Sequence, residues 1–226
     1  MFLSLLFSNP LVAVAWSVAA LFSLSVHECS HALVAKWRGD KTGEWAGRLT
    51  LNPLAHLDPL GTIPLILFGF GWAKPVPYNP YNLRDPKWDS VRVGLAGPMS
   101  NLIVAAAAGV LLRLIIGMQW LPIQNMLVVF LLLLMVLNLS LLFFNIIPIH
   151  PLDGSKLFFA LFDAPKYARL RQIVAVHGPN VLFALVLISL LTNIDAFFFI
   201  SLPSFATCNA LLGENCGGLL GAIFGG

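Results

Sequence analysis

Residues 26–31 read Val-His-Glu-Cys-Ser-His, and they place an HExxH motif inside an apolar run that begins near Leu11. In a helix, His27 and His31 lie four positions apart on one face, so both imidazoles can reach one metal ion while Glu28 stands beside it. A catalytic zinc ion usually takes three protein ligands and keeps a fourth position for water. The motif therefore predicts a zinc centre with an adjacent base, and it requires a third ligand from elsewhere.

Asp153 is the best candidate for that third ligand. It lies in residues 145–154, Asn-Ile-Ile-Pro-Ile-His-Pro-Leu-Asp-Gly, a polar interruption at the end of a second apolar run. Asp153 could instead cap a helix over 155–162, because Asp is a preferred N-cap residue. Beside an HExxH motif we favour ligation, which predicts one zinc ion per chain held by His27, His31 and Asp153.

The composition indicates a membrane protein. Hydrophobic residues make up 58% of the 226 residues and charged residues 10%, with a mean hydropathy of +0.86. These values are too apolar for a soluble domain of this length. The net charge of +3 forms no basic stripe and there is no aromatic RNA-binding pattern, which argues against nucleic acid as a partner.

The hydropathy pattern predicts an all-α polytopic membrane protein with about four to six transmembrane helices, built as a single membrane-embedded domain over 1–226. About 20 apolar residues in a helix cross roughly 30 Å of hydrocarbon. By this criterion we expect core spans over 11–36, 91–117 and 123–147, and an additional span over 173–194. The apolar segment 196–226 contains six glycines, one proline and two asparagines, which leaves a helix, a hairpin or a tail open.

The stretch between the first two spans is expected to form a short β and re-entrant segment. Residues 37–58 are polar and show no helical period, which favours a loop with one or two short strands. Residues 61–72 are apolar but too few to cross, and Pro64 and Gly71 interrupt them.

The basic residues predict the orientation. If the first span ends in the cytoplasm, Arg113 alone lies on the outer side, and the other twelve basic residues lie on the cytoplasmic side: Lys36, Arg38, Lys41, Arg48, Lys74, Arg84, Lys87, Arg92, Lys156, Lys166, Arg169 and Arg171. The proposed metal site is then near the cytoplasmic face, and the N-terminus is outside. Cys208 and Cys216 lie on the far side, where an oxidising compartment would permit a disulfide.

Three motifs in this order resemble the site-2 protease family of intramembrane zinc metalloproteases. They are HECSH on an early span, Gly-Pro-Met-Ser-Asn at 97–101 on the next full span, and residues 145–154 with their prolines and Leu-Asp-Gly ending. Residues 51–59 and 71–77 are similar to the compact prokaryotic branch of that family, which lacks PDZ and CBS modules. One departure is His150, where the family often has proline.

The resemblance implies a core of three helices, with zinc on the two histidines and Asp153 and with Glu28 as catalytic acid/base. It favours a role for Asn145 near the substrate or the developing oxyanion, although Asn145 could also bridge helices. Asn101, beside Gly97 and Pro98, is expected to be a structural hydrogen bonder. His56 is either an ordinary loop histidine or part of a gate or substrate strand, and the sequence leaves both open.

These features predict a zinc metalloendopeptidase that hydrolyses peptide bonds within or near transmembrane segments, in the lipid bilayer. A single-span protein is the expected substrate, and the sequence does not exclude homo-oligomers. Two other functions compete with this one. A metal-ion transporter would use intramembrane His, Glu and Asp along its pathway, and a non-catalytic chaperone could be built on the same scaffold.

Overall fold

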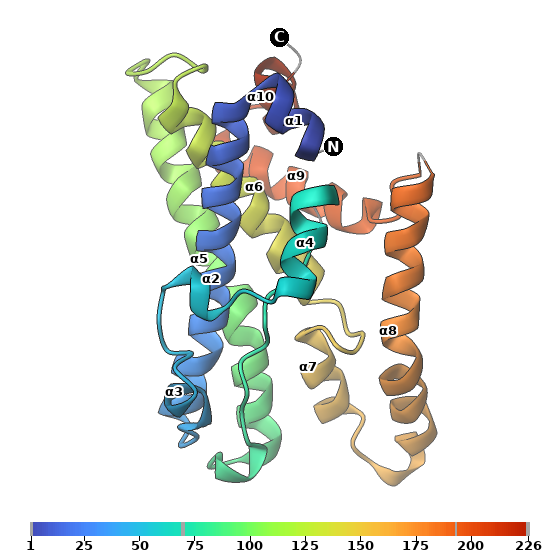
Figure 1. Cartoon of the computed structure of the whole chain (residues 1–226). Helices are drawn as coiled ribbons and strands as arrows, with labels where there is room; N and C mark the ends of the chain where they lie inside the picture. Colours follow the sequence, from blue (N-terminus) through green and yellow to red (C-terminus); the bar gives the residue numbers. More distant parts are fainter. Residues whose placement is uncertain (1, 69–70, 193, 225–226) are drawn as a thin grey trace.

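The computed structural model describes residues 2–68, 71–192 and 194–224, and all of its regular elements are helices (Figure 1). In chain order they are α1 (Phe2–Ser8), α2 (Pro10–Trp37), α3 (Thr42–Trp45), η1 (Pro53–Ala55), α4 (Pro59–Phe68), η2 (Pro80–Asn82), α5 (Pro86–Gly117), α6 (Met126–Asn145), α7 (Gly154–Leu161), η3 (Pro165–Tyr167), α8 (Ala168–Leu191), α9 (Phe198–Leu212) and α10 (Cys216–Phe224). Positions 193 and 225–226 of the expected C-terminal segments lie outside the described residues.

Within the described residues, four helices are long and apolar enough to cross a membrane, which confirms the expected all-α polytopic class. They are α2, α5, α6 and the helical stretch Pro165–Leu191 that contains α8. Side-chain caps set where the first three begin: Asn9, Asp85 and Asn125 each accept a hydrogen bond from a backbone N–H of the first turn. Asp85 and the following Pro86 start α5 five residues before the predicted position 91, because a cap outweighs the polar composition of that first turn.

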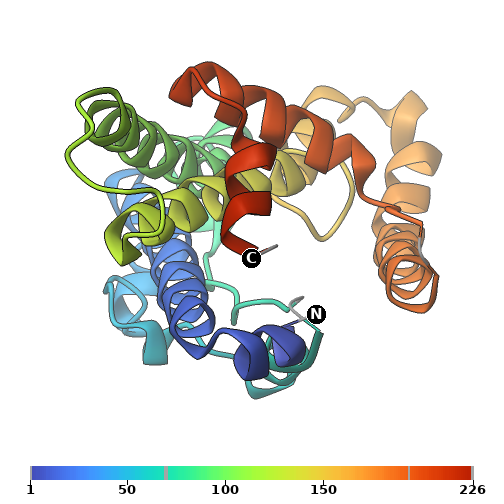
Figure 2. The ribbon, with the colours of Figure 1, turned by 90° about the horizontal axis from the view of Figure 1, so that it is seen from above.

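Helices α2, α5 and α6 pack against one another and form the core. Buried apolar side chains such as Leu112, Leu132 and Met135 fill the space between them. Helix α9 runs across the bundle and packs on α5 and α6 (Figures 1 and 2). A disulfide joins Cys208 of α9 to Cys216 of α10, so the C-terminal segment is a pair of helices linked covalently.

The segment between α2 and α5 differs in part from the expectation. In place of short strands, the described residues of this segment form α3, η1 and one isolated antiparallel bridge between Leu57 and Ala73. Helix α4 is too short to span a membrane. After α4 the chain comes back beside the residues that precede it, where the Lys74 N–H donates to the His56 carbonyl at 2.8 Å. The segment is therefore a hairpin built around a short helix. Gly69, within this segment, lies outside the described residues.

Two buried polar side chains hold the connections on either side of this hairpin. The Arg48 guanidinium donates to the carbonyls of Ala55 and Lys74, which ties the two arms together. Asp40, just after α2, accepts hydrogen bonds from the Asn79 N–H and the Asn82 side chain. Burial acts to raise the pKa of Asp40, but these hydrogen bonds outweigh it and hold that pKa below its usual range.

Candidate metal centre and substrate cleft

Both histidines of the HExxH motif present the same ring nitrogen to one point between α2 and α7. His27 and His31 lie on one face of α2 and are 4% and 6% exposed. The His31 Nδ1 lies 2.6 Å from the Val93 carbonyl, and the His27 Nδ1 lies 2.5 Å from the Asn101 Oδ1. Because both partners are oxygen acceptors, each Nδ1 carries the proton and each Nε2 keeps a lone pair.

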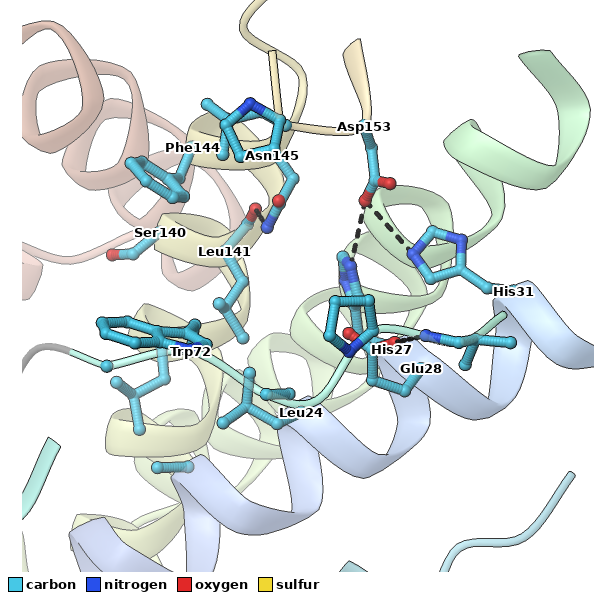
Figure 3. A pocket seen from close by; sticks show the side chains of 18 of the residues that line it. Leu24, His27, Glu28, His31, Trp72, Ser140, Leu141, Phe144, Asn145 and Asp153 are labelled. Carbon is cyan, nitrogen blue, oxygen red and sulfur yellow. Dashed lines mark hydrogen bonds and ion pairs between the residues drawn. The ribbon is translucent and has the colours of Figure 1, made fainter. Parts of the chain in front are cut away.

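Asp153 completes the group from the other half of the chain. Its Oδ2 lies 3.1 Å from the His27 Nε2 and 3.2 Å from the His31 Nε2, and the three ligand atoms lie within 4.8 Å of one another (Figure 3). Ligand distances of about 2.0–2.1 Å place tetrahedral zinc ligands about 3.3 Å apart, and the two separations from the Asp153 Oδ2 are close to this value. Asp153 occupies the N-cap position of α7 but makes no side-chain capping hydrogen bond.

The second oxygen of Asp153 has a cationic partner. Lys156, one turn along α7, places its Nζ 3.2 Å from the Asp153 Oδ1 and 5.1 Å from the centre of the Tyr78 ring. Burial acts to raise the pKa of Asp153, but the neighbouring His31 and His27, when they also carry a proton on Nε2, and the Lys156 charge outweigh it. The pKa of this carboxyl is therefore held well below its usual range, and Asp153 is ionised at neutral pH.

Helix α5 approaches α2 closely at Gly97. A Cβ atom at this position would lie 2.5 Å from both the His27 Nε2 and the His31 Nε2. The Gly97 position in the Gly-Pro-Met-Ser-Asn motif therefore leaves open the space next to both candidate ligand atoms. At this position α5 therefore packs directly against the metal-binding face of α2.

Glu28 faces a segment that crosses the site. Residues 72–78, which we call the strap, return from α4 toward η2, and the Val76 N–H donates to the Glu28 Oε2 at 3.2 Å. Figure 3 shows Glu28 beside His27 and separate from the two contacts that Asp153 makes. Glu28 is thus adjacent to the ligand group, with its carboxylate held by the strap.

An apolar cleft of about 580 Å³ runs from the ligand group into the bundle. It is bounded by α2, the strap, α6 and the start of α9, and its lining includes Leu24, Trp72, Leu141, Phe144 and Ile200. The ligand group therefore lies at the wall of a cavity suited to an apolar segment.

The two other predicted site residues, Asn145 and His56, do not belong to the ligand group. Asn145 lines the cleft, but its Nδ2 donates to the Leu141 carbonyl of its own helix at 3.0 Å (Figure 3). His56 is not among the residues that line this cleft; it is buried beneath the hairpin, with its Nε2 2.8 Å from the Thr50 carbonyl.

Sequence reasoning missed Lys156, Asn138 and the contact of the strap with Glu28. The spacing of Lys156, three residues after Asp153 on a helix, could have identified it as a partner of the carboxylate. Asn138 stands in a largely apolar span, and a polar residue there usually has a role. The strap contact uses a backbone N–H, for which the side-chain sequence carries no signal.

The fold and this group of side chains define a multi-pass membrane protein with a candidate zinc centre opening on an apolar cleft. The pattern of Peptidase family M50 matches residues 115–189. The chain is 41% identical over 158 residues to the Bacillus subtilis (strain 168) protein named "Putative zinc metalloprotease YwhC", a match covering 69% of this chain and 72% of that protein. It is 35% identical over 140 residues to "Putative zinc metalloprotease Rip2" of Mycolicibacterium smegmatis, covering 59% of this chain and 52% of that protein. No solved structure matches the chain.

The chain therefore belongs to peptidase family M50, the site-2 protease family of intramembrane zinc metalloproteases. Zinc is the metal that this membership implies, and the two histidines with Asp153 are compatible with binding it. The membership does not favour a metal-ion transporter or a non-catalytic chaperone.

Proposed function

We propose that this chain is a zinc metalloendopeptidase of the HExxH type, in which His27, His31 and Asp153 hold one zinc ion and Glu28 is the catalytic acid/base. One observation carries the proposal: one ligand atom from each of these three residues converges at the wall of an apolar cleft, although Asp153 lies 126 positions after His27. We further propose that the chain works as a single membrane-embedded protease domain over 1–226.

The residues divide the chemistry between them. Zinc, when bound, supplies Lewis-acid chemistry, because it polarises a carbonyl and acidifies water. Glu28 does not belong to the ligand group, so its carboxylate is available to take a proton from the attacking water and to deliver one to the leaving amide nitrogen. The Val76 N–H donates to Oε2 of Glu28, which orients the carboxylate and leaves Oε1 to carry the proton.

The substrate is a transmembrane segment of another membrane protein, most simply a single-span protein. Its helix must unwind locally, because a peptide bond within a helix is shielded from attack. Asn145 can assist at the developing oxyanion only if its Nδ2 turns away from the Leu141 carbonyl. We assign the His56 side chain to holding the hairpin from which the strap emerges, since its buried imidazole is hydrogen-bonded to the Thr50 carbonyl.

We propose that the site lies toward the cytoplasmic side and the N-terminus outside. The helix ends that carry most of the basic residues, the end of α2 and the starts of α5 and α8, lie at one end of the molecule (Figure 1). Arg113 lies near Gly213, toward the opposite end. This distribution supports a positive-inside orientation.

The test of this function is Glu28→Gln, which keeps the size of the side chain but removes its basicity. We expect cleavage of a co-expressed single-span substrate to fall by about 10²- to 10⁴-fold, while zinc content stays near one ion per chain. The products are identified by mass spectrometry. Cleavage at the parent rate would exclude Glu28 as the base. Full zinc content in a His27→Ala, His31→Ala double variant would exclude the metal site.

A further inference from the structure

Three buried polar side chains connect the core helices next to the metal centre. Ser23 of α2, Asn101 of α5 and Asn138 of α6 are each 0% exposed. Polar groups buried at membrane depth are costly unless they are paired. These three are paired with one another, and the resulting chain of hydrogen bonds ends on His27.

The chain of contacts is continuous. The His27 Nδ1 lies 2.5 Å from the Asn101 Oδ1, and the Asn101 Nδ2 donates to the Asn138 Oδ1 at 2.7 Å. The Asn138 Nδ2 donates to the Ser23 Oγ at 2.7 Å. The Ser23 hydroxyl donates to the Ala19 carbonyl at 2.7 Å, within its own helix.

The far end of this chain dictates the direction of every hydrogen bond in it. Backbone carbonyls only accept, so the Ser23 hydroxyl uses its proton on Ala19 and receives one from Asn138. The Asn138 Nδ2 also donates to the Leu134 carbonyl at 2.7 Å, which fixes the same amide orientation a second time. Asn138 therefore offers its oxygen to the Asn101 Nδ2, and the Asn101 oxygen is directed at His27.

His31 shows why this matters. Its Nδ1 proton is held by the Val93 backbone carbonyl, a group that cannot exchange donor for acceptor. The partner of His27 is an amide, and an Asn101 amide turned over would present N–H to Nδ1. The imidazole would then carry its proton on Nε2, the nitrogen next to Asp153, and could not bind a metal there.

We propose that Ser23, Asn138 and Asn101 are positioning residues that hold His27 in the one tautomer able to bind zinc through Nε2. The network supplies for His27 what a backbone carbonyl supplies for His31. This inference rests on the proposed zinc site, and it adds two residues, Ser23 and Asn138, that do not touch the ligand group.

The test measures zinc affinity of the purified full-length chain in detergent by competition with a chromophoric chelator. Asn101→Leu should weaken zinc binding about 10- to 100-fold, the range found when partners of metal-bound histidines are removed. Asn138→Leu should weaken it about 10-fold, at the low end of that range. Asn101→Asp keeps an acceptor on His27 and should retain affinity close to that of the parent.

Ser23 has a matched control in Ser25. Both hydroxyls are buried on α2 and donate to the carbonyl four residues earlier at 2.7 Å, but only Ser23 also accepts from Asn138. Ser23→Ala should weaken zinc binding and Ser25→Ala should not. If a leucine variant does not give monodisperse protein, the comparison of Ser23→Ala with Ser25→Ala tests the proposal.

If Ser23, Asn101 and Asn138 only stabilise the fold, zinc affinity will be the same in the folded variants and in the parent. Folded Asn101→Leu and Asn138→Leu proteins that bind zinc as tightly as the parent would overturn the inference, as would equal affinities of Ser23→Ala and Ser25→Ala. If the parent itself bound no zinc, or if His27→Ala and His31→Ala left its zinc affinity unchanged, the proposed metal site would fail instead. The two failures are therefore distinguishable.

Discussion

At the scale of single residues, each candidate ligand has a second polar atom that does not face the metal position, and the site depends on the contact which that atom makes. Asp153 directs one oxygen at the histidines and the other at Lys156. Lys156 thus fixes which Asp153 oxygen faces the ligand group and favours the ionised carboxylate. A ligand held in this way loses less conformational freedom when the metal binds.

Removing Lys156 should therefore weaken zinc binding without removing a ligand. Lys156→Met keeps much of the apolar stem and deletes the charge, and we expect zinc affinity to fall about 10-fold. Lys87→Met is the control, because Lys87 pairs with the exposed Asp163, which does not belong to the ligand group. Chelator competition on both purified variants measures the difference. Equal affinities would show that Asp153 needs no cationic partner.

The residue scale is also where the sequence was most informative. His27, Glu28 and His31 are recognisable because their spacing places them on one helical face. Asn101 was expected to be a structural hydrogen bonder, yet it contacts the ligand His27. Nothing within one span indicates which residue of another span it will meet, so that contact could not be predicted from the sequence alone.

At the scale of elements, the close approach of α5 to α2 is what allows the ligand group to form. Gly97→Ala adds a Cβ that would lie 2.5 Å from both Nε2 atoms, and neither ring can retreat without giving up its Nδ1 hydrogen bond. We expect this variant to fold but to lose zinc. Gly117→Ala, on the same helix with open space around it, should keep zinc. Metal analysis of the two purified proteins is the measurement, and a fully loaded Gly97→Ala protein would contradict the packing argument.

Element boundaries show where sequence reading is weaker. Apolar length located the four long helices, because a span must satisfy its own backbone in the bilayer. It also indicated that residues 61–72 are too few to span, but it did not predict a helix through Pro64, because Pro64 and the glycines suggested a break. Pro64 is the sixth residue of that helix. The strands expected before α4 are replaced by turns, which hydrogen bonds of Arg48 and Asp58 hold in place.

At the scale of the whole molecule, the basic residues predict an orientation that can be measured. Single cysteines replacing Lys87 and Gln119, in a chain whose free Cys29 is changed to serine, are treated with an impermeant thiol reagent on intact cells. Position 119 should react from outside and position 87 only after the membrane is opened, because the basic end faces the cytoplasm. Reaction at position 87 in intact cells would reverse the proposed topology.

Access to the site is the other property of the whole molecule, and it depends on the strap. The strap lines the cleft and its Val76 N–H is hydrogen-bonded to Glu28, so a substrate segment that approaches Glu28 from this side of the cleft must displace the strap. The strap also lies against α3, where a Cβ atom added at Gly43 would be 2.9 Å from the Val76 Cγ1. The Val76 Cγ1 is one bond of about 1.5 Å from its Cβ, so the two Cβ atoms lie at most about 4.4 Å apart, within reach of a disulfide, whose Cβ atoms lie about 3.5–4.5 Å apart.

Joining these two positions should therefore stop cleavage while the metal centre stays intact. In a Gly43→Cys, Val76→Cys protein we expect oxidation to abolish cleavage of a single-span substrate, and mild reduction to restore it, with zinc content unchanged in both states. Gly43→Cys and Val76→Cys alone, treated with the same oxidant, separate the effect of the cross-link from the effect of each substitution. A cross-linked protein that cleaves at the rate of its reduced form would show that the strap can stay in place, and that substrate reaches Glu28 by another face of the cleft.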